Sequence, residues 1–273
     1  MATEVQEIIE QIDDVHKSYL KWEKSGGEER DGLVHYSLVR NKRAPFVPLR
    51  RALPHLNLTL VTSAGAYVDG MQSFDTTVTG GDLSFREIPA QITAENLRIT
   101  ARGYDPEAVL KDINSQIPLD RLNEFEANGI IGSQTEVFWS LCGHIADASS
   151  FVEQTLPKLV ERIKRYQAQA VLLIPASYLC HQTMALAARA LELAGLPTMT
   201  LAVDRKIMEI VRPPRSVYYD GKLGSVAGQP LWPEHQRRIL DEALRLLEPM
   251  DEPGIRKLDV ELETDVEIER GER

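Results

Sequence analysis

Residues 170–203 read AVLLIPASYLCHQTMALAARALELAGLPTMTLAV, and this stretch decides the fold. Its first five residues, 170–174, are all apolar, which is typical of a buried strand. Residues 183–194 predict a helix that Gly195 stops, and residues 198–203 predict a second strand. Two apolar strands joined by a helix of about three turns form a βαβ unit, whose strands are parallel. We therefore expect an α/β fold.

The same patterns extend toward both ends of the chain. Apolar, strand-like runs occur at 58–62, 97–101 and 136–141. Helical spacing occurs at 105–113 with Asp105 as N-cap, at 118–128, at 149–166 with Ser149 or Ser150 as cap and Pro157 as a kink or true start, and at 232–248. The predicted class is an open, mainly parallel sheet with flanking helices, built from Rossmann-like βαβ units.

Composition along the chain predicts three regions. Residues 1–41 hold an amphipathic helix over 1–25 and a connector. Residues 42–250 form the α/β domain, in which the Gly-, Thr- and Asp-rich stretch 69–85 is expected to be a loop or a hairpin. Residues 251–273 are a charged, acidic tail that we expect to be mobile.

The charge balance argues against two classes of partner. The chain has 31 Lys and Arg against 41 Asp and Glu, and its net charge of −10 repels nucleic acid and anionic membranes. Its N-terminus lacks the apolar run of a signal peptide, and no stretch resembles a membrane span. Two cysteines are too few for a disulfide framework and lack zinc-site spacing. We expect a cytoplasmic protein with reduced thiols and no bound metal.

Residues with chemical potential follow the strand at 170–174. The segment PASYLCHQT leaves the carboxyl end of that strand and enters a helix, where free amides and the helix dipole stabilise an anion. A thiolate at Cys180 would have a lowered pKa there, and His181 could move a proton. The alternatives are an inert, buried Cys180 and helix-capping roles for Ser177 and Thr183.

Two other stretches offer candidate groups. Cys142 and His144 follow the run at 136–141 and could face the thiol segment, although core packing is the simpler role for Cys142. Thr62, Ser63 and Gly65 follow the strand at 58–62. Their amides and hydroxyls suit a substrate carboxylate, and they equally suit a tight turn.

Four ordered stretches carry a resemblance to a known family. LIPASYLCHQTMALAARALELAGLPTMTL at 173–201, LVTSAGAYV at 60–68, GDLSFREIP at 81–89 and YDPEAVLKDINSQIPLDRLNEFEANGIIG at 104–132 resemble the B-subunit family of the glycine, sarcosine, betaine and D-proline reductases. The likeness covers roughly residues 40–250.

The resemblance implies reductive cleavage of a carbon–nitrogen bond in an amino acid or betaine. In the family a selenolate or thiolate attacks the carbon that bears nitrogen, and a neighbouring thiol releases the product. Cys180 matches the resolving position and Ser177 the attacking one, while Gln182 and Thr183 are candidate substrate-binding residues. The resemblance also implies other reductase subunits as partners, or a homo-oligomer. It places a possible pyruvoyl group on a partner subunit and no cofactor within this chain.

This sequence departs from the family pattern at two places. A hydroxyl at Ser177 neither ionises readily near pH 7 nor undergoes the reversible oxidation of sulfur. Ala101 and Gly103 stand where relatives often carry histidines, and Arg102 between them could hold a substrate carboxylate or lie on the surface. Three interpretations stay open: a reductase subunit using Cys180, a non-redox lyase, desulfurase or isomerase, and a silent binding or scaffold subunit.

Overall fold

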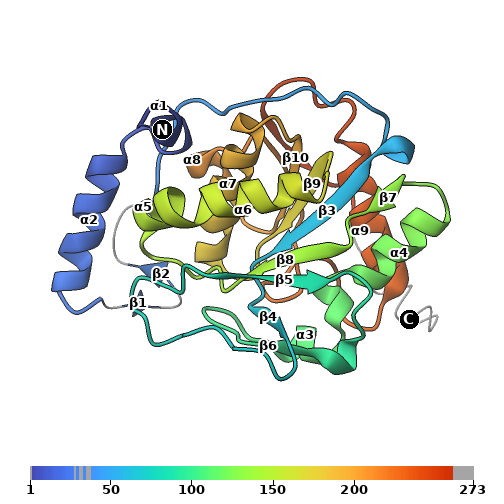
Figure 1. Ribbon diagram of the computed structural model, residues 1–273, viewed down its shortest axis with the longest axis horizontal. Helices are drawn as coiled ribbons and strands as arrows, with labels where there is room; N and C mark the ends of the chain where they lie inside the picture. The colour runs from blue at the N-terminus through green and yellow to red at the C-terminus, as the bar shows by residue number, and fades with distance from the viewer. Residues whose placement is uncertain (1, 28, 31–32, 35–37, 261–273) are drawn as a thin grey trace.

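The computed structural model describes residues 2–27, 29–30, 33–34 and 38–260 (Figure 1). Its centre is an eight-stranded sheet with the order β12-β11-β10-β9-β3-β8-β5, in which β7 also pairs with β3. Only β5 runs antiparallel to its neighbour. The strands are β3 (Asn57–Thr62), β5 (Phe85–Pro89), β7 (Ser133–Gln134), β8 (Val137–Leu141), β9 (Ala170–Ile174), β10 (Thr198–Ala202), β11 (Arg215–Tyr218) and β12 (Gly254–Lys257). The predicted fold class is confirmed.

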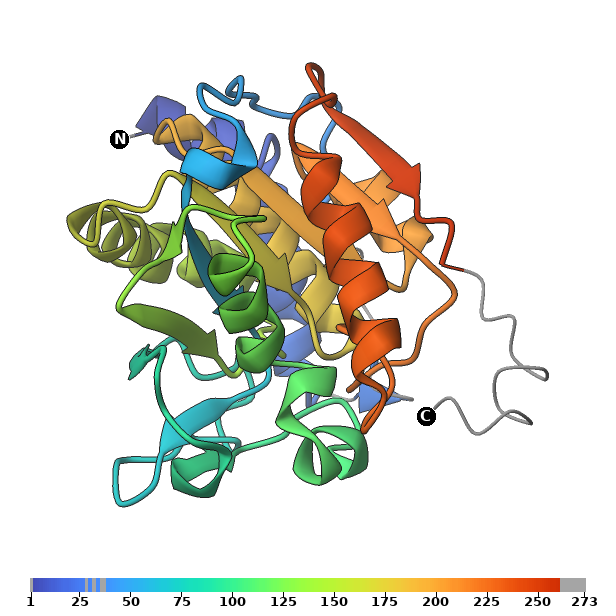
Figure 2. The same ribbon diagram turned by 90° about the vertical axis from the view of Figure 1, so that its right-hand side faces the viewer.

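Helices cover both faces of this sheet (Figures 1 and 2). One apolar cluster joins the strands to α4 (Leu119–Ala127) and α9 (Pro233–Arg245). A second cluster joins them to α1 (Ala2–Ile8), α6 (Leu156–Arg165), α7 (Tyr178–Leu193) and α8 (Arg205–Val211). Every residue of β9 and β10 is buried, as expected for parallel strands covered on both faces.

Shorter elements complete the described part of the chain. They are α2 (Ile12–Lys24), α3 (Glu107–Lys111), α5 (Ala148–Ser150), the 3-10 turns η1 (Leu53–His55), η2 (Ala94–Asn96) and η3 (Ile113–Ser115), the π-helical turn η4 (Phe151–Thr155), and two antiparallel pairs, β1 (Glu29–Arg30) with β2 (Leu33–Val34) and β4 (Ala66–Val68) with β6 (Leu97–Ile99). In the residues described, no helix has the length and apolar character to cross a membrane.

The strand order contains a topological switch at β3 and β9. The chain runs from β3 outward to β8, then returns past β3 to β9 and continues in the opposite direction to β10 and β11. The loops that follow β3 and β9 therefore lead away from each other. In open α/β sheets, ligands bind in the crevice that forms at the carboxyl ends of such strands.

A connector over residues 38–52 lies along α7. The backbone amide of Val39 donates to Oε1 of Gln182 at 2.8 Å, and the amide of Val47 donates to Glu192. Between these points, the buried guanidinium of Arg189 donates to the carbonyl oxygen of Arg43 at 2.6 Å. The same guanidinium reaches carbonyl oxygens of Glu7, Ile8 and Arg212. Arg189 thus joins α1, the connector and the end of α8 to one helix.

A buried ion pair joins α7 to β11. Nη1 of Arg215 lies 2.6 Å from Oε1 of Glu192, and both side chains have no solvent exposure. Burial raises the pKa of Glu192, while Arg215 and the amides of Thr198 and Val47 act in the opposite direction. Because each charge has hydrogen-bond partners on several segments, the pair holds the connector, α7 and β11 together.

The N-terminal region differs from the predicted single helix over 1–25. The structure has two helices, α1 and α2, separated at residues 9–11. The amide of Glu10 donates to Oδ1 of Asn41 at 3.0 Å, and the Glu10 carboxylate accepts from the amides of Lys42 and Arg43. These tertiary hydrogen bonds replace helical ones, so the connector interrupts a pattern that is helical in sequence.

Helix caps also differ from the predictions. Asp147, rather than Ser149 or Ser150, caps α5 by accepting from the amide of Ser150 at 3.0 Å. Helical backbone continues from α5 through a π-helical turn into α6, so Pro157 lies where the helix changes type and does not mark the start of the helical segment. Asp105 accepts from the amide of Glu107 at 3.0 Å, although α3 begins only at Glu107.

The C-terminal region begins with ordered structure. Residues 254–257 form β12 at the edge of the sheet, where sequence predicted a mobile tail from 251 onward. Leu258 and Val260 are buried against the core. Residues 261–273, the rest of that tail, lie outside the described residues. The division of the chain into three regions stays a prediction.

Candidate active site at the ends of three strands

The candidate site lies at the topological switch. Ser63 follows β3, and Ala176 and Ser177 follow β9. The amide of Ala176 donates to Oγ of Ser63 at 2.9 Å, and the amide of Ser63 donates to the carbonyl of Ile174 at 3.1 Å. The two strand ends are thus bonded directly, and the residues after β8 complete the group.

Ser177 is the N-cap of α7. Its Oγ accepts from the backbone amide of Cys180 at 3.2 Å, which satisfies one of the free amides of the first turn. The helix therefore begins at Tyr178, five residues before the predicted start at Thr183. Cys180 and His181 lie in the first turn of a helix rather than in a loop.

The thiol of Cys180 is enclosed. Its side chain has no solvent exposure, and Sγ lies 3.9 Å from the carbonyl oxygen of Ser63. A Cβ placed on Gly143 would lie 3.3 Å from this sulfur and 2.3 Å from the Cβ of Ser63. Only glycine at 143 leaves room for both side chains. The sequence predicted that the thiol opens into a pocket. In the structure the helix begins earlier than predicted, and Cys180 is buried by the residues around it.

Cys142 is near the group but is directed elsewhere. Its Sγ lies 3.6 Å from the carbonyl oxygen of Thr100. Successive residues of an extended chain point to opposite sides, so Gly143 rather than Cys142 faces Cys180. Burial, followed by the proximity of Cys180, raises the pKa of Cys142 to about 12. Cys142 is therefore a protonated thiol at neutral pH in this arrangement.

His144 joins the group through Ser177. Its Nδ1 lies 3.5 Å from Oγ of Ser177, and the ring is fully buried. A Cβ on Gly103 would lie 2.1 Å from the same Nδ1, and Gly103 has a φ of +76°. The His144 ring therefore occupies the space that a side chain at position 103 would need, which explains glycine at this departure from the family pattern.

His181 is held on both ring nitrogens. Nδ1 lies 2.6 Å from the carbonyl oxygen of Ser177, and Nε2 accepts from the amide of Val203 at 3.1 Å. Burial lowers the pKa of His181 to about 4, so the ring is neutral. Both ring nitrogens thus have backbone partners, and the ring joins α7 to the end of β10.

The predicted substrate-binding residues make internal contacts. Oγ1 of Thr183 donates to the carbonyl of Gly143 at 2.6 Å, and Oγ1 of Thr62 accepts from the amide of Ala64 at 3.3 Å. Gln182 accepts from the connector, while its buried Nε2 has no hydrogen-bond partner in the described structure. The structure brings Ser63, Ser177, Cys180 and Thr183 together with His144.

Gly65 and Arg102 lie on the side of β4 and β6. Gly65 has a φ of +72°, and a Cβ there would lie 2.0 Å from the carbonyl oxygen of Thr100, so this position is a tight turn. Arg102 donates to the carbonyl oxygens of Val78 at 2.6 Å and Thr79 at 3.4 Å. These bonds fix the loop over residues 69–84, which is irregular rather than a hairpin.

Sequence reasoning missed Tyr104. Its hydroxyl donates to the carbonyl of Ala64 at 2.7 Å. Burial, and then the nearby Cys180 and Cys142, raise the pKa of this phenol above its usual range. Nothing in the local pattern marks a tyrosine between a strand and a short helix, so only the tertiary fold reveals it.

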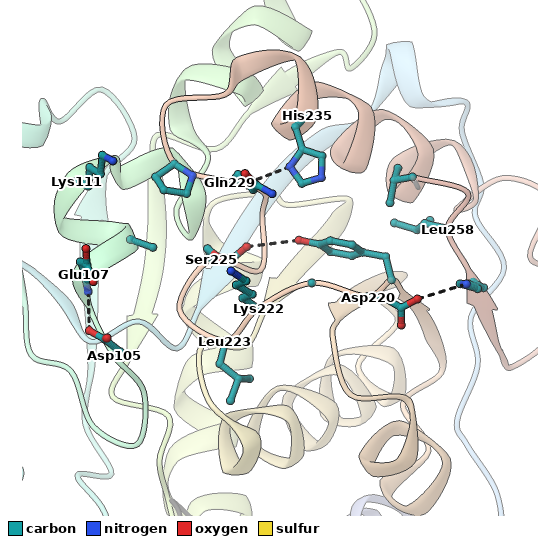
Figure 3. Close-up of a pocket in the computed structure, with 16 residues that line it drawn as sticks. Asp105, Glu107, Lys111, Asp220, Lys222, Leu223, Ser225, Gln229, His235 and Leu258 are labelled. Carbon is teal, nitrogen blue, oxygen red and sulfur yellow. Dashed lines mark hydrogen bonds and ion pairs between the residues drawn. The ribbon is translucent and has the colours of Figure 1, made fainter. Parts of the chain in front are cut away.

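A cavity of about 820 Å³ opens between α3, the loop over residues 219–230 and the end of β12 (Figure 3). Asp105, Lys222, Ser225 and His235 are among its lining residues. The amide of Gly224, in the loop that forms one wall, donates to the carbonyl of Ala176 at 3.0 Å. Cys180 is not one of the lining residues.

Gly224 explains the close contact between this wall and Tyr104. A Cβ there would lie 2.5 Å from the carbonyl oxygen of Asp105 and 3.0 Å from the Tyr104 ring. The loop that forms this wall thus packs against Tyr104 through Gly224. Among the residues described, no cluster of three or more His, Cys, Asp or Glu side chains could hold a metal ion.

Comparisons with known proteins identify the family of this chain. The family model for glycine/sarcosine/betaine reductase selenoprotein B matches residues 34–176, ending one residue before Ser177. The chain is 29% identical to D-proline reductase subunit gamma of Acetoanaerobium sticklandii, over 77% of this chain and 85% of that protein.

Two longer relatives match in part. Identity is 26% to glycine reductase complex component B subunit gamma of Symbiobacterium thermophilum, over 61% of this chain and 39% of that protein. It is 28% to sarcosine reductase complex component B subunit beta of Peptoclostridium acidaminophilum, over 66% of this chain and 41% of that protein. No solved structure matches. The family model covers more than half of the length of this chain, which therefore belongs to the glycine/sarcosine/betaine reductase selenoprotein B family.

Proposed function

We propose that this chain is a cytoplasmic subunit of an amino-acid reductase complex, and that Cys180 acts in the reductive cleavage of a carbon–nitrogen bond in a small amino-acid-type substrate. The observation that supports this most is the position of Cys180 at the topological switch of a chain from this family. The names of the relatives, which are subunits of proline, glycine and sarcosine reductases, support a complex with other subunits.

The proposed reaction needs two thiols. The thiolate of Cys180 attacks the carbon that bears nitrogen, so a C–S bond forms, the C–N bond breaks, and the amine leaves with the electron pair and takes a proton. A second thiol then attacks the Cys180 sulfur, so an S–S bond forms, the C–S bond breaks and the carbon takes a proton. Where the second thiol belongs to an external dithiol, the other thiol of that dithiol then attacks the mixed disulfide, so the bond to Cys180 breaks, Cys180 leaves as a thiolate that takes a proton, and the dithiol, which is the reductant, ends as a disulfide.

An external dithiol best supplies that second sulfur. Ser177 has no sulfur, and Cys142 is protonated and directed toward Thr100. A redox component of the complex, or dithiothreitol in an assay, would serve. A pyruvoyl group on a partner subunit would activate the substrate amine, so this chain itself needs no cofactor.

The test uses the complex that a tagged chain recovers from its native cells. We expect other reductase subunits in the recovered material and dithiothreitol-dependent turnover of one of D-proline, glycine, sarcosine and betaine. Cys180→Ser should remove turnover by several orders of magnitude. Cys142→Ser, the matched control, should leave the rate within a few-fold. Equal rates for wild type and Cys180→Ser would reject the proposal.

A second candidate is a subunit that binds but does not react. Two observations favour it: Ser177 is used as a helix cap, and Cys180 is fully enclosed. In that case the recovered complex turns over its substrate at the same rate with either cysteine replaced, and removal of this chain abolishes assembly or substrate affinity rather than chemistry.

A further inference from the structure

The cavity is lined by both buried polar and exposed charged side chains. Tyr219, Ser225 and His235 are its buried polar residues. Exposed acidic and basic side chains come from α3, the loop over residues 219–230 and the end of β12 (Figure 3). Its volume of about 820 Å³ is that of an ordinary small-molecule site.

His235 presents a hydrogen-bond donor without an acceptor. Its Nδ1 accepts from the amide of Gln229 at 3.0 Å, and burial lowers its pKa to about 4. A neutral ring that accepts at Nδ1 carries its proton on Nε2. In the described structure this buried Nε2 has no hydrogen-bond partner. His235 is only 6% exposed, so little water reaches it. A buried donor left unsatisfied is costly, so it indicates a missing acceptor.

The rim supplies charges of both signs. The ammonium groups of Lys111 and Lys222 form no ion pair with any described residue, whereas Lys257 lies 3.5 Å from Asp220. Glu107 lines the same cavity and accepts no hydrogen bond from a described side chain. The charged side chains that line the cavity therefore provide cations for a ligand carboxylate and an anion for a ligand ammonium group.

A strained residue, Leu231, follows the lining residue Pro230 but does not itself line the cavity. Leu231 has a φ of +61°, a region that branched side chains rarely adopt, and it is 58% exposed. Its amide donates to Oδ2 of Asp112 at 2.8 Å, and Gln236 donates to the same oxygen at 2.7 Å. Strain held in place by a hydrogen-bond network is typical of functional sites.

We propose that this cavity binds a small zwitterionic amino acid, with a carboxylate oxygen accepting the hydrogen on Nε2 of His235. Lys222 and Lys111 balance the carboxylate charge, and Glu107 lies on the side of the ammonium group. The ligand then lies against the loop over residues 219–230, which packs on Tyr104 through Gly224. That this ligand is the substrate rests on the proposed function, whereas its binding does not.

Two substitutions at one position test the donor. His235→Asn keeps an acceptor where Nδ1 lies, for the Gln229 amide, and removes the Nε2 donor. His235→Gln keeps a donor where Nε2 lies. With the full chain and D-proline or glycine as probes in titration calorimetry, we expect His235→Asn to weaken binding roughly 10- to 100-fold, the loss of one hydrogen bond to a charged group. His235→Gln should stay within a few-fold of wild type.

A second pair of variants tests the charges and guards against misfolding. Lys222→Met should weaken binding several-fold, while Lys206→Met, on α8 and away from the cavity, should not. Acetate, which lacks the ammonium group, should bind more weakly than either amino acid. Absence of binding by wild type, or equal affinity in His235→Asn, Lys222→Met and wild type, would overturn the proposal.

The two proposals fail in distinguishable ways. Binding is measured on the Cys180→Ser chain, where no reaction can occur. If binding depends on His235 but the turnover of the complex does not depend on Cys180, the binding site is supported and the proposed function is rejected. If turnover depends on Cys180 but not on His235 or Lys222, the proposed function is supported and the binding site is rejected.

Discussion

At the scale of single residues, Ser177 decides which chemistry the site can perform. Ser177→Cys would place two thiols three positions apart at a helix N-terminus, where amides and the dipole favour a thiolate. We expect this variant to form an internal disulfide with Cys180 when it is refolded in a glutathione redox buffer, seen as a loss of two hydrogens in the intact mass. Its free energy of unfolding should fall by about 1 kcal/mol, because a good N-cap is lost.

Ser177→Ala is the control for that variant. It should lose the same cap energy without any change in mass under the oxidant. Two free thiols at positions 177 and 180 after prolonged oxidation would show that the geometry of the first turn does not suit a pair.

The enclosure of both native thiols gives a second prediction. Cys180 has no exposed surface, Cys142 is 3% exposed, and burial holds the pKa of Cys142 at about 12. Because only the thiolate reacts, Ellman's reagent should modify neither thiol of the native chain within minutes at pH 8. Both should react in guanidinium chloride. Rapid modification of Cys180 in the native chain would show that the site opens in solution.

Sequence could predict only part of this residue-scale arrangement. The order of Ser177, Cys180 and His181 after an apolar strand indicates where the site lies, because strand ends and helix starts are local features. The contacts of Gly143, Tyr104 and His235 could not be predicted, since each is made to a residue at least 30 positions away or to a cavity wall.

At the scale of elements, apolar runs predicted β3, β8, β9 and β10 almost to the residue. The start of α7 was predicted too late, because the polar stretch at 177–183 reads as a loop until the cap of Ser177 is known. β12 was missed, since a four-residue strand with exposed Arg256 and Lys257 has no apolar signal and exists only through its pairing with β11.

The ion pair between α7 and β11 gives a prediction at this scale. Arg215→Met leaves the Glu192 carboxylate buried without its partner, so the free energy of unfolding should fall by about 3–5 kcal/mol. Arg205→Met breaks the exposed pair with Glu209 on α8 and should cost less than about 1 kcal/mol. Urea unfolding of both variants measures the difference, and similar losses would show that the buried pair has no special weight.

At the scale of the whole molecule, stability should depend on pH through buried histidine. The pKa of His181 falls from 6.5 to about 4 on burial, so the unfolded chain binds a proton that the folded chain does not. Stability is therefore complete above pH 6.5 and decreases as pH falls toward 4, by about 3 kcal/mol from this residue. His235 acts in the same direction.

Chemical denaturation between pH 4 and pH 7 measures this effect. His181→Gln should be less stable at pH 7 and should show a shallower decrease toward pH 4, by about 1.4 kcal/mol per pH unit. His55→Gln, at an exposed position, should follow the wild-type curve. An unchanged slope in His181→Gln would place the pH dependence elsewhere.

The contacts between the connector and α7 have a consequence for regulation. Gln182, Arg189 and Glu192 tie one rigid helix to residues 39–47, and Cys180 lies in the first turn of that helix. We therefore expect that a subunit which docks on the connector and displaces it moves the sulfur of Cys180 as well. Allosteric control of the thiol would therefore begin at the N-terminal side of the protein, far along the sequence from the residue it affects.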